Sequence, residues 1–228
     1  MIHCLQNTLF VKSGSAPNTS IQQVTGQVQS MPNRRNVKSV SVEAADAHER
    51  RRDFLGEAEI STLLKAAKQS RHGVRDHLLI LMMYRHGLRV SEAIALCRND
   101  VDLAQSRLWV ARLKNGLSVE QPIAGDELRA LRRWLALRQD HLPWLFISER
   151  RHALTRQAVN RIIATAARRA NLAHVHPHML RHSCGFALAN QGRDLRLIQD
   201  YLGHRDPRHT AHYTRTAACR FDGLWQGH

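Results

Sequence analysis

The sequence has few cysteines, and their spacing excludes two kinds of stabilising site. Only four are present and none forms a CxxC pair: Cys4, Cys97, Cys184 and Cys219. A zinc ribbon or a disulfide framework needs closely spaced or regularly paired cysteines. Neither is predicted, and dispersed thiols fit a reducing cytoplasm.

Long apolar runs are also missing. No segment approaches the roughly 18 consecutive apolar residues that span a bilayer. The N-terminus lacks the charged and then apolar pattern of a secretory signal. We therefore expect a soluble, cytoplasmic protein without a membrane partner.

Acidic residues are scarce beside basic ones. The chain has 19 Asp and Glu against 34 Lys and Arg, a formal net charge of +15. Such a surplus favours a polyanionic partner, above all nucleic acid. A basic surface that serves solubility, or a ribosomal or membrane contact, is the alternative that charge alone leaves open.

Residues 1–50 differ in composition from the rest of the chain. They are rich in Ser, Thr, Gln, Asn and Val, contain one aromatic, Phe10, and show no helical or strand period. They hold 5 of the basic and 3 of the acidic residues, so most of the positive charge lies in residues 51–228. We predict a disordered extension over 1–50 and one folded domain over 51–228, with Met31 as an alternative start to Met1.

From residue 57 on, apolar residues recur mainly at helical spacing. Helices are predicted from 57, over 75–86, from 91 with Ser91 as N-cap, and over 126–139, 155–170, 178–190, 194–202 and 207–213. Two strands, 107–113 and 117–123, flank the hairpin sequence Lys114-Asn115-Gly116, and 144–147 is predicted as one more. The fold class is mainly α with a small antiparallel β-sheet (α+β).

Five features are candidates for chemistry: Arg89, Lys114, the run His178-Met179-Leu180-Arg181-His182, Leu202-Gly203-His204, and Tyr213. Each is weak alone. An arginine at a helix start is most often a salt-bridge partner at the surface, and a lysine in a hairpin turn is commonly solvated.

The His-x-x-Arg run favours a phosphate site. His178 and Arg181 lie three positions apart, so on a helix both project to one face and suit the oxygens of a phosphate. A metal site formed by His178 and His182 is disfavoured, because the run lacks the Glu of zinc peptidases and Arg181 repels a cation. A capping or packing role for the histidines is the remaining alternative.

The three tyrosines have different surroundings. Tyr84 ends an apolar helix and Tyr201 lies between Ile198 and Leu202, so both are expected in the core. Tyr213 lies in a polar, basic stretch, where it would meet a phosphate. A phenol with an unperturbed pKa near ~10 is a poor nucleophile, so it needs cationic neighbours and a proton acceptor to attack.

Taken in chain order, these candidates resemble the catalytic signature of the tyrosine recombinases and phage integrases. Longer stretches are similar to the fimbrial phase-variation recombinases of the FimB and FimE type: Tyr84-Arg85-His86-Gly87, His176-Pro177-His178-Met179-Leu180-Arg181-His182, Leu197-Ile198-Gln199-Asp200-Tyr201-Leu202-Gly203-His204, and Gly223-Leu224-Trp225. The resemblance covers about residues 51–228.

The resemblance implies a metal-free and ATP-free strand transfer, without any cofactor, through a 3′-phosphotyrosine. It makes Tyr213 the nucleophile and has Arg89 and Arg181 hold the scissile phosphate. The other implied roles are a proton donor to the leaving 5′ oxygen (Lys114), an aid to proton transfer from the tyrosine (His178), a phosphate hydrogen bond (His204) and an acid that orients the arginine site (Glu92). His182 is expected to be structural.

The resemblance also implies the partners. The substrate is expected to be double-stranded DNA with inverted repeats around an invertible segment. A homo-oligomer would bind it, as in the tetramers of the family, which exchange C-terminal segments (here about residues 214–228). Accessory DNA-bending proteins are also expected. Residues 1–50 look too short and too polar for the core-binding domain of larger members. Candidate DNA-backbone contacts are Arg85, Arg112, Arg156, Arg161, Arg205 and Arg208.

Four other functions remain open at this point. An integrase or excisionase of a mobile element uses the same residues on differently arranged sites. A type IB topoisomerase shares the chemistry, and a catalytically silent DNA-binding regulator shares the charge. A metal-dependent nuclease is disfavoured because clustered carboxylates are missing.

Overall fold

The computed structural model describes residues 53–113 and 116–215, which all belong to the predicted folded domain. The predicted disordered extension, Lys114 and most of the segment expected to exchange between protomers lie outside the described residues. Within the described part, no helix is long and apolar enough to cross a membrane.

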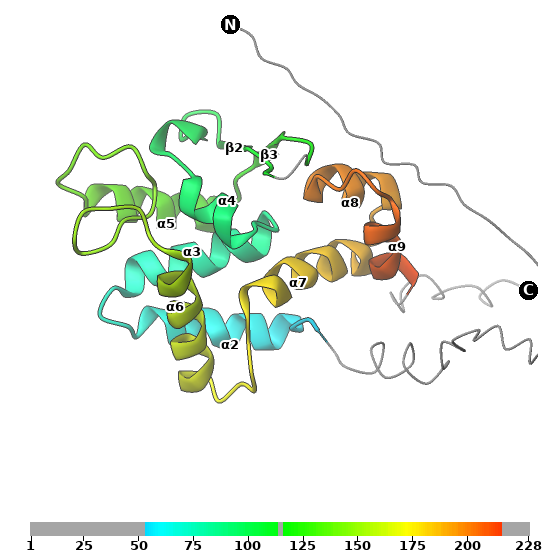
Figure 1. Cartoon of the computed structure of the whole chain (residues 1–228), viewed down its shortest axis with the longest axis horizontal. Helices are drawn as coiled ribbons and strands as arrows, with labels where there is room; N and C mark the ends of the chain where they lie inside the picture. Colours follow the sequence, from blue (N-terminus) through cyan, green and yellow to red (C-terminus); the bar gives the residue numbers. More distant parts are fainter. Residues whose placement is uncertain (1–52, 114–115, 216–228) are drawn as a thin grey trace, which may run out of the picture. The chain divides into compact units, whose positions relative to one another are not determined.

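The described chain is mainly helical, which confirms the predicted fold class (Figure 1). The helices are α2 (Glu57–Lys68), α3 (Gly73–Arg85), α4 (Val90–Ala95), the 3-10 turn η1 (Arg98–Asp100), α5 (Gly125–Ala136), α6 (Arg156–Arg169), α7 (Pro177–Asn190), α8 (Leu195–Leu202) and α9 (Arg208–Arg215). The strands are β1 (Val101–Asp102), β2 (Arg107–Val110) and β3 (Val119–Pro122).

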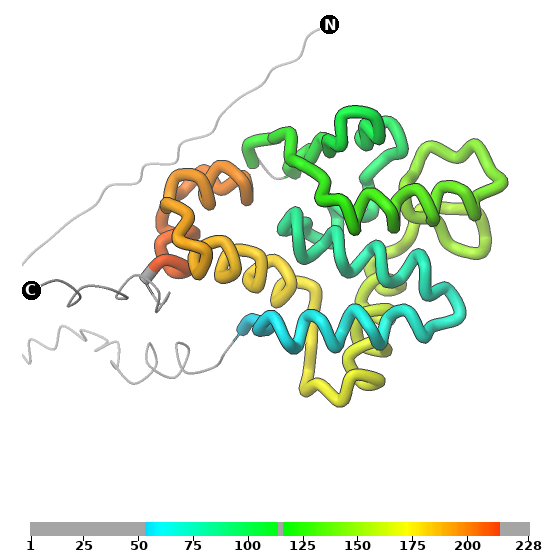
Figure 2. The backbone as a smooth tube through the Cα atoms, turned by 180° about the vertical axis from the view of Figure 1, so that it is seen from behind, coloured from blue at the N-terminus to red at the C-terminus, as the bar shows by residue number. Residues whose placement is uncertain are grey.

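Helix α3 is the centre of the fold. Its apolar run, Leu78 to Met83, is buried on all sides, as expected for a helix enclosed by others. It packs against α2, α5 and α7, while α2 also packs against α6 (Figure 2). A second, smaller apolar cluster joins α7, α8 and α9, and it includes Phe186 and Tyr213.

The three strands form one antiparallel sheet in the order β1-β2-β3. The hairpin is confirmed, but its strands are shorter than predicted: the last pair is Val110 opposite Val119. The backbone N–H of Arg112 instead donates to the Ser118 hydroxyl at 3.1 Å, which ends the ladder. The strand predicted over 144–147 is wrong, because only the isolated bridges Cys97–Trp144 and Ile147–Ala153 form there.

Candidate active site

Arg89 lies where the chain turns from α3 into α4. It is the N-cap of α4, so the prediction that Ser91 caps this helix is wrong. The Glu92 carboxylate accepts both the Arg89 backbone N–H at 2.9 Å and its Nη1 at 2.7 Å. A carboxylate in the first turn also suits the partial positive charge of a helix N-terminus. The result is an arginine held by its own helix, with 27% of its side chain exposed.

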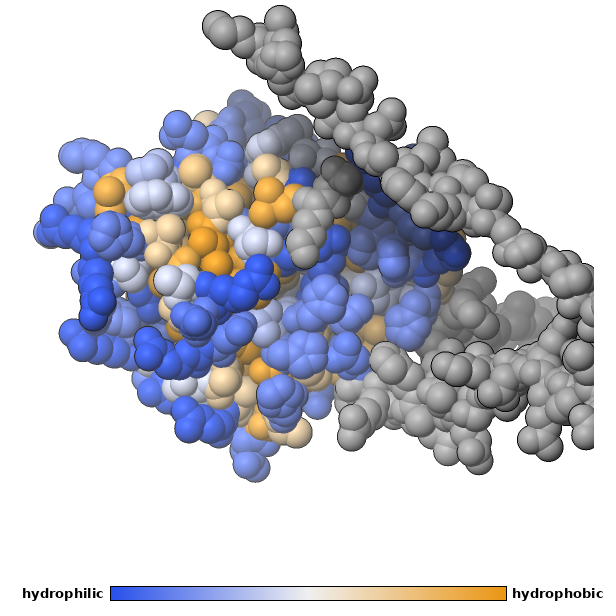
Figure 3. All heavy atoms as spheres, viewed as in Figure 1, coloured by the Kyte–Doolittle hydropathy of each residue, from blue (hydrophilic) through white to orange (hydrophobic). Residues whose placement is uncertain are grey.

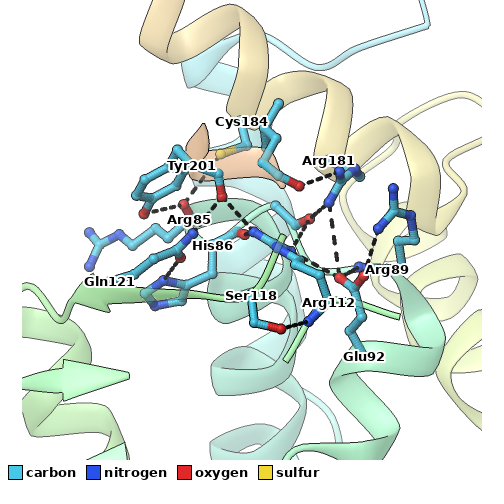
Figure 4. A network of polar contacts seen from close by, with 12 residues as sticks. Arg85, His86, Arg89, Glu92, Arg112, Ser118, Gln121, Arg181, Cys184 and Tyr201 are labelled. Carbon is cyan, nitrogen blue, oxygen red and sulfur yellow. Dashed lines mark hydrogen bonds and ion pairs between the residues drawn. The ribbon is translucent and has the colours of Figure 1, made fainter. Parts of the chain in front are cut away.

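Arg112 reaches the same carboxylate from the hairpin (Figure 4). Its Nη1 lies 2.9 Å from Glu92 Oε2, and its side chain is 0% exposed. Nη2 donates to the carbonyls of His86 at 2.9 Å and Tyr201 at 2.7 Å. Arg112 is therefore an internal tie between the hairpin, the start of α4 and the end of α8, and it is not a DNA-backbone contact.

Arg181 projects from α7 into the same cluster and is 2% exposed. Its Nη1 donates to the Gly87 carbonyl and its Nη2 to the Leu202 carbonyl, the latter at 2.7 Å. These carbonyls lie two residues before Arg89 and His204, so Arg181 ties both segments together. Each terminal nitrogen retains a second N–H for an incoming phosphate. Burial, Arg112 and Arg89 lower the pKa of Arg181 to about 10.

One carboxylate thus faces three guanidinium groups. Glu92 Oε2 is 4.0 Å from Arg181 Nη1, in addition to its bonds with Arg89 and Arg112. Burial opposes ionisation of Glu92, but these hydrogen bonds and charges lower its pKa, so it stays ionised. Two positive charges remain uncompensated in a largely buried setting, and this strongly favours the binding of an anion. The cluster is suited to bind a phosphodiester.

A second set of buried hydrogen bonds supports the cluster from the sheet side (Figure 4). Gln121 Nε2 donates to the Tyr201 carbonyl at 2.7 Å, so its Oε1 accepts from His86 Nδ1 at 2.7 Å. His86 Nε2 lies 2.8 Å from Glu127 Oε1. These bonds fix β3, α3, α5 and the end of α8 relative to one another.

His204 follows α8 and is placed by two features. Gly203 ends the helix with φ of 68°, a left-handed conformation that glycine adopts without strain. The His204 Nδ1 lies 2.9 Å from the Thr210 hydroxyl of α9. Burial and Arg181 lower the pKa of His204 to about 3. The ring is neutral. In the tautomer whose Nδ1 accepts from the Thr210 hydroxyl, Nε2 carries a hydrogen that it can donate to a phosphate.

Tyr213 is more deeply buried than the sequence suggested. It is 2% exposed, whereas Tyr84 and Tyr201, expected in the core, are only partly buried. Its hydroxyl lies 2.9 Å from His182 Nδ1. Burial raises its pKa to about 12, and Arg181 and Arg89 partly oppose this rise. The phenol is therefore protonated in the free protein.

His178 lies at the surface, one turn before His182 on α7. The two rings meet edge to face with centroids 4.8 Å apart. Burial of part of the ring and the charge of Arg181 lower the pKa of His178. His178 and Arg89 line an open groove of about 370 Å³ together with Arg156 and Asn160. The groove gives the buried arginine cluster a side that solvent, and hence DNA, can reach.

The structure also separates the arginines considered as DNA contacts. Arg85 binds the Asp126 carboxylate through both terminal nitrogens, at 2.5 and 2.7 Å. The side chains of four others are exposed: Arg156, Arg161, Arg205 and Arg208. Most of the face seen in Figure 3 is covered by hydrophilic side chains. Within the described residues, no group of three or more His, Cys, Asp or Glu is arranged to hold a metal ion.

The structure therefore brings together Arg89, Glu92 and Arg181, and places His204 and Tyr213 nearby on α8–α9. Sequence reasoning did not name Thr210, and it gave two further residues at the site other roles: Arg112 as a candidate DNA contact and His182 as structural. Thr210 and Tyr213 lie three apart on one helix, a spacing that was visible in the sequence. No local pattern indicated that Arg112 would be buried.

Comparison with known proteins agrees with this site. The model of the phage integrase family matches residues 53–220. The chain belongs to this family and is a tyrosine-type site-specific DNA recombinase.

Individual relatives are similar over most of the chain. The type 1 fimbriae regulatory protein FimB of Escherichia coli (strain K12) is 46% identical over 184 residues, which cover 78% of this chain and 92% of FimB. The corresponding FimE is 45% identical over 182 residues, covering 77% and 92%. A crystal structure of XerA recombinase superposes with a TM-score of 0.64 at 30% identity, over 71% of this chain and 59% of that chain.

Proposed function

We propose that this recombinase inverts a DNA segment flanked by inverted repeats and thereby switches a promoter. The observation that carries the chemistry is the arginine cluster, in which three guanidinium groups share the single carboxylate of Glu92 beside a buried tyrosine. The proposed outcome, inversion, is supported by the likeness to FimB and FimE, which are named as fimbriae regulatory proteins and match over 92% of their length.

In the proposed reaction, Tyr213 attacks the scissile phosphorus and the 5′ oxygen leaves. Arg89 and Arg181 bind the non-bridging oxygens and stabilise their growing charge, which planar guanidinium groups do better than an ammonium. His204 donates from Nε2 to the same phosphate. No nucleotide is needed, because the phosphotyrosine conserves the energy of the broken bond. No metal ion is needed, because the guanidinium groups stabilise the charge that develops on the phosphate.

Three further residues act around this centre. We propose that Glu92 orients Arg89, consistent with their two hydrogen bonds. Lys114 protonates the leaving 5′ oxygen from the hairpin loop. His178, at the edge of the groove beside Arg89, aids proton transfer from the tyrosine.

The proposed partners follow from the reaction. Exchange of four strands needs four active sites, so we propose a homotetramer on two synapsed DNA sites, aided by proteins that bend DNA. The net charge of +15 supports binding to the DNA backbone. Acting on the chromosome, the protein would reside in the cytoplasm at the nucleoid.

The chemistry is tested with the purified full chain, labelled DNA from the flanks of its own gene, EDTA and no ATP. We expect a denaturation-resistant protein–DNA adduct with the wild type and none with Tyr213→Phe, which binds the same DNA. Equal adduct formation by Tyr213→Phe would contradict the nucleophile assignment. Loss of the adduct with EDTA would contradict the metal-free mechanism.

The outcome of recombination is tested separately. Two copies of the cleaved site are placed around a promoter, either inverted or directly repeated. We expect inversion in the first arrangement, seen by PCR across the junctions, and no efficient excision in the second. Efficient excision from direct repeats and no inversion would favour the integrase or excisionase alternative.

A further inference from the structure

The Tyr213 ring packs against α7. A Cβ added at Gly185 would be 2.7 Å from Cδ2 and Cε2 of the Tyr213 ring, so the ring lies directly on the bare backbone of that helix. The Phe186 ring meets it edge to face, with centroids 5.2 Å apart at 81°. Packing therefore fixes the ring in one place, and the hydroxyl points to a single side chain of α7.

That side chain is His182. Its Nδ1 is 2.9 Å from the Tyr213 hydroxyl, and its Nε2 faces Asp53 Oδ2 at 3.5 Å. A carboxylate only accepts hydrogen bonds, so the tautomer that suits both neighbours has the hydrogen on Nε2 and a lone pair on Nδ1. The lone pair then receives the phenol hydrogen bond. Among the described residues this is an Asp–His–Tyr series that ends on the reacting oxygen.

We propose that His182 is the catalytic residue that takes the proton of Tyr213 during attack, and that Asp53 positions it. This inference rests on the proposed role of Tyr213 as the nucleophile. As the O–H bond breaks, the proton goes to His182 Nδ1 and the oxygen electron pair forms the bond to phosphorus. The bond from phosphorus to the 5′ oxygen breaks, and that oxygen takes its electron pair and a proton from Lys114. Religation reverses each step.

The charges around His182 explain why the proton stays on the tyrosine until DNA is bound. Burial and the neighbouring His178 lower the pKa of His182 to about 4, His212 and Arg181 act in the same direction, and Asp53 opposes them. A phosphate bound by Arg89 and Arg181 adds a negative charge close to the imidazole, which favours its protonated form. Binding of the DNA phosphate would therefore make His182 a stronger base.

His178 is the natural rival for this role. It lies one turn earlier on α7, but its ring is exposed and contacts the His182 ring edge to face. The hydrogen bond of the Tyr213 hydroxyl goes to His182. The matched pair His182→Asn and His178→Asn therefore distinguishes the two histidines.

The experiment measures the single-turnover rate of adduct formation by the full chain on nicked DNA, at pH 6 to 9. In His182→Asn, the amide oxygen can still accept the tyrosine hydrogen bond but cannot take the proton. We expect a loss of about a hundredfold or more at pH 7, a rate that rises with pH as solvent base takes over, and DNA binding within about threefold of wild type. His178→Asn should show a clearly smaller loss of the rate of adduct formation.

A second substrate separates this role from protonation of the leaving group. When sulfur replaces the bridging 5′ oxygen, the leaving thiolate needs little protonation. We expect this substrate to restore the rate of adduct formation in Lys114→Ala but not in His182→Asn. Tyr213→Phe should form no adduct with either substrate. Adduct formation by that variant would contradict the proposed function, in which Tyr213 is the nucleophile, and not only this inference.

Asp53→Asn keeps the inference testable if His182→Asn folds poorly, because Asp53 is 51% exposed. We expect it to slow adduct formation by about tenfold, less than the roughly hundredfold or more expected from loss of the base itself. Wild-type rates for both Asp53→Asn and His182→Asn, or rescue of His182→Asn by the sulfur substrate, would overturn the assignment. So would a larger, pH-dependent loss in His178→Asn.

Discussion

Arg112 and Glu92 form an ion pair in the interior, with Nη1 2.9 Å from Oε2 and side chains 0% and 1% exposed. The pair joins the hairpin to the start of α4, segments that are 20 positions apart in the sequence. Through Glu92 it reaches Arg89, and through the Tyr201 carbonyl it reaches the end of α8. The geometry of the phosphate site therefore depends on an arginine that does not itself face solvent.

We expect Arg112→Leu to be strongly destabilising. It removes the donor to the backbone carbonyls of His86, Gly87 and Tyr201 and leaves the buried Glu92 with less compensation. Breaking such a pair typically costs about 3–5 kcal/mol. The free energy of unfolding is measured by urea denaturation. Arg107→Leu, at an exposed position of the neighbouring strand β2, is the control and should stay within about 0.5 kcal/mol of wild type. Equal stabilities would show that the Arg112 contacts contribute little.

Gly185→Ala should impair the tyrosine without unfolding α7. Alanine is the better helix former by roughly 1 kcal/mol, but its Cβ would overlap the Tyr213 ring, which must then move. We expect unchanged helix content by circular dichroism and at least about tenfold slower adduct formation, because small displacements of reacting groups are costly. Gly125→Ala is the control, since its Cβ would find only Arg129 Nη1, at 3.7 Å. Wild-type rates for Gly185→Ala would show that Tyr213 attacks from another position.

Thr210→Val tests the support of His204. The change is nearly isosteric, but it removes the hydroxyl that lies 2.9 Å from His204 Nδ1 at a position that is 0% exposed. Leaving a buried ring nitrogen without a partner costs about 1–3 kcal/mol, and NMR of the imidazole nitrogens should show a mixture of tautomers. Thr62→Val, which removes an exposed hydrogen bond to the Ala58 carbonyl, is the control. It should leave the free energy of unfolding and the tautomer of His204 nearly unchanged. A single retained tautomer in Thr210→Val would contradict the role of Thr210.

Acid should destabilise the fold between pH 7 and 5, before carboxylates titrate. Burial is the main cause that lowers the pKa of His204 to about 3, and of His182 and His77 to about 4. Their unfolded pKa is near ~6.5, so the unfolded chain binds more protons and stability falls as pH drops below that value. We expect a loss of about 1 kcal/mol or more by pH 5, measured from urea midpoints at constant ionic strength.

His77→Gln, outside the site, should remove only part of this pH dependence. The double variant His182→Asn, His204→Gln should remove most of the rest. A urea midpoint that does not change between pH 7 and 5 in the wild type would show that these histidines are not held in the neutral form.

The sequence alone determined the helices, the β-hairpin and the class of protein. The apolar period of 3.6 residues and the dense run Leu78 to Met83 predicted the helices to within a few residues, since both depend on local spacing. The ordered motifs around Arg89, His178 and Tyr213 identified the family, because catalytic residues keep their order along the chain whatever their contacts are.

Only the tertiary structure decided how these residues meet. Ser91 looked like the N-cap of α4, but Arg89 holds that position. Its backbone N–H donates to the Glu92 carboxylate, which Arg112 from the hairpin also binds. Tyr213 looked exposed because its neighbours in sequence are polar, yet α9 packs its ring onto Gly185 and its hydroxyl onto His182. Burial and protonation depend on contacts between segments that are far apart in the sequence. Arg181 and Gly87, for example, are separated by 94 positions. Such contacts leave no trace in local composition.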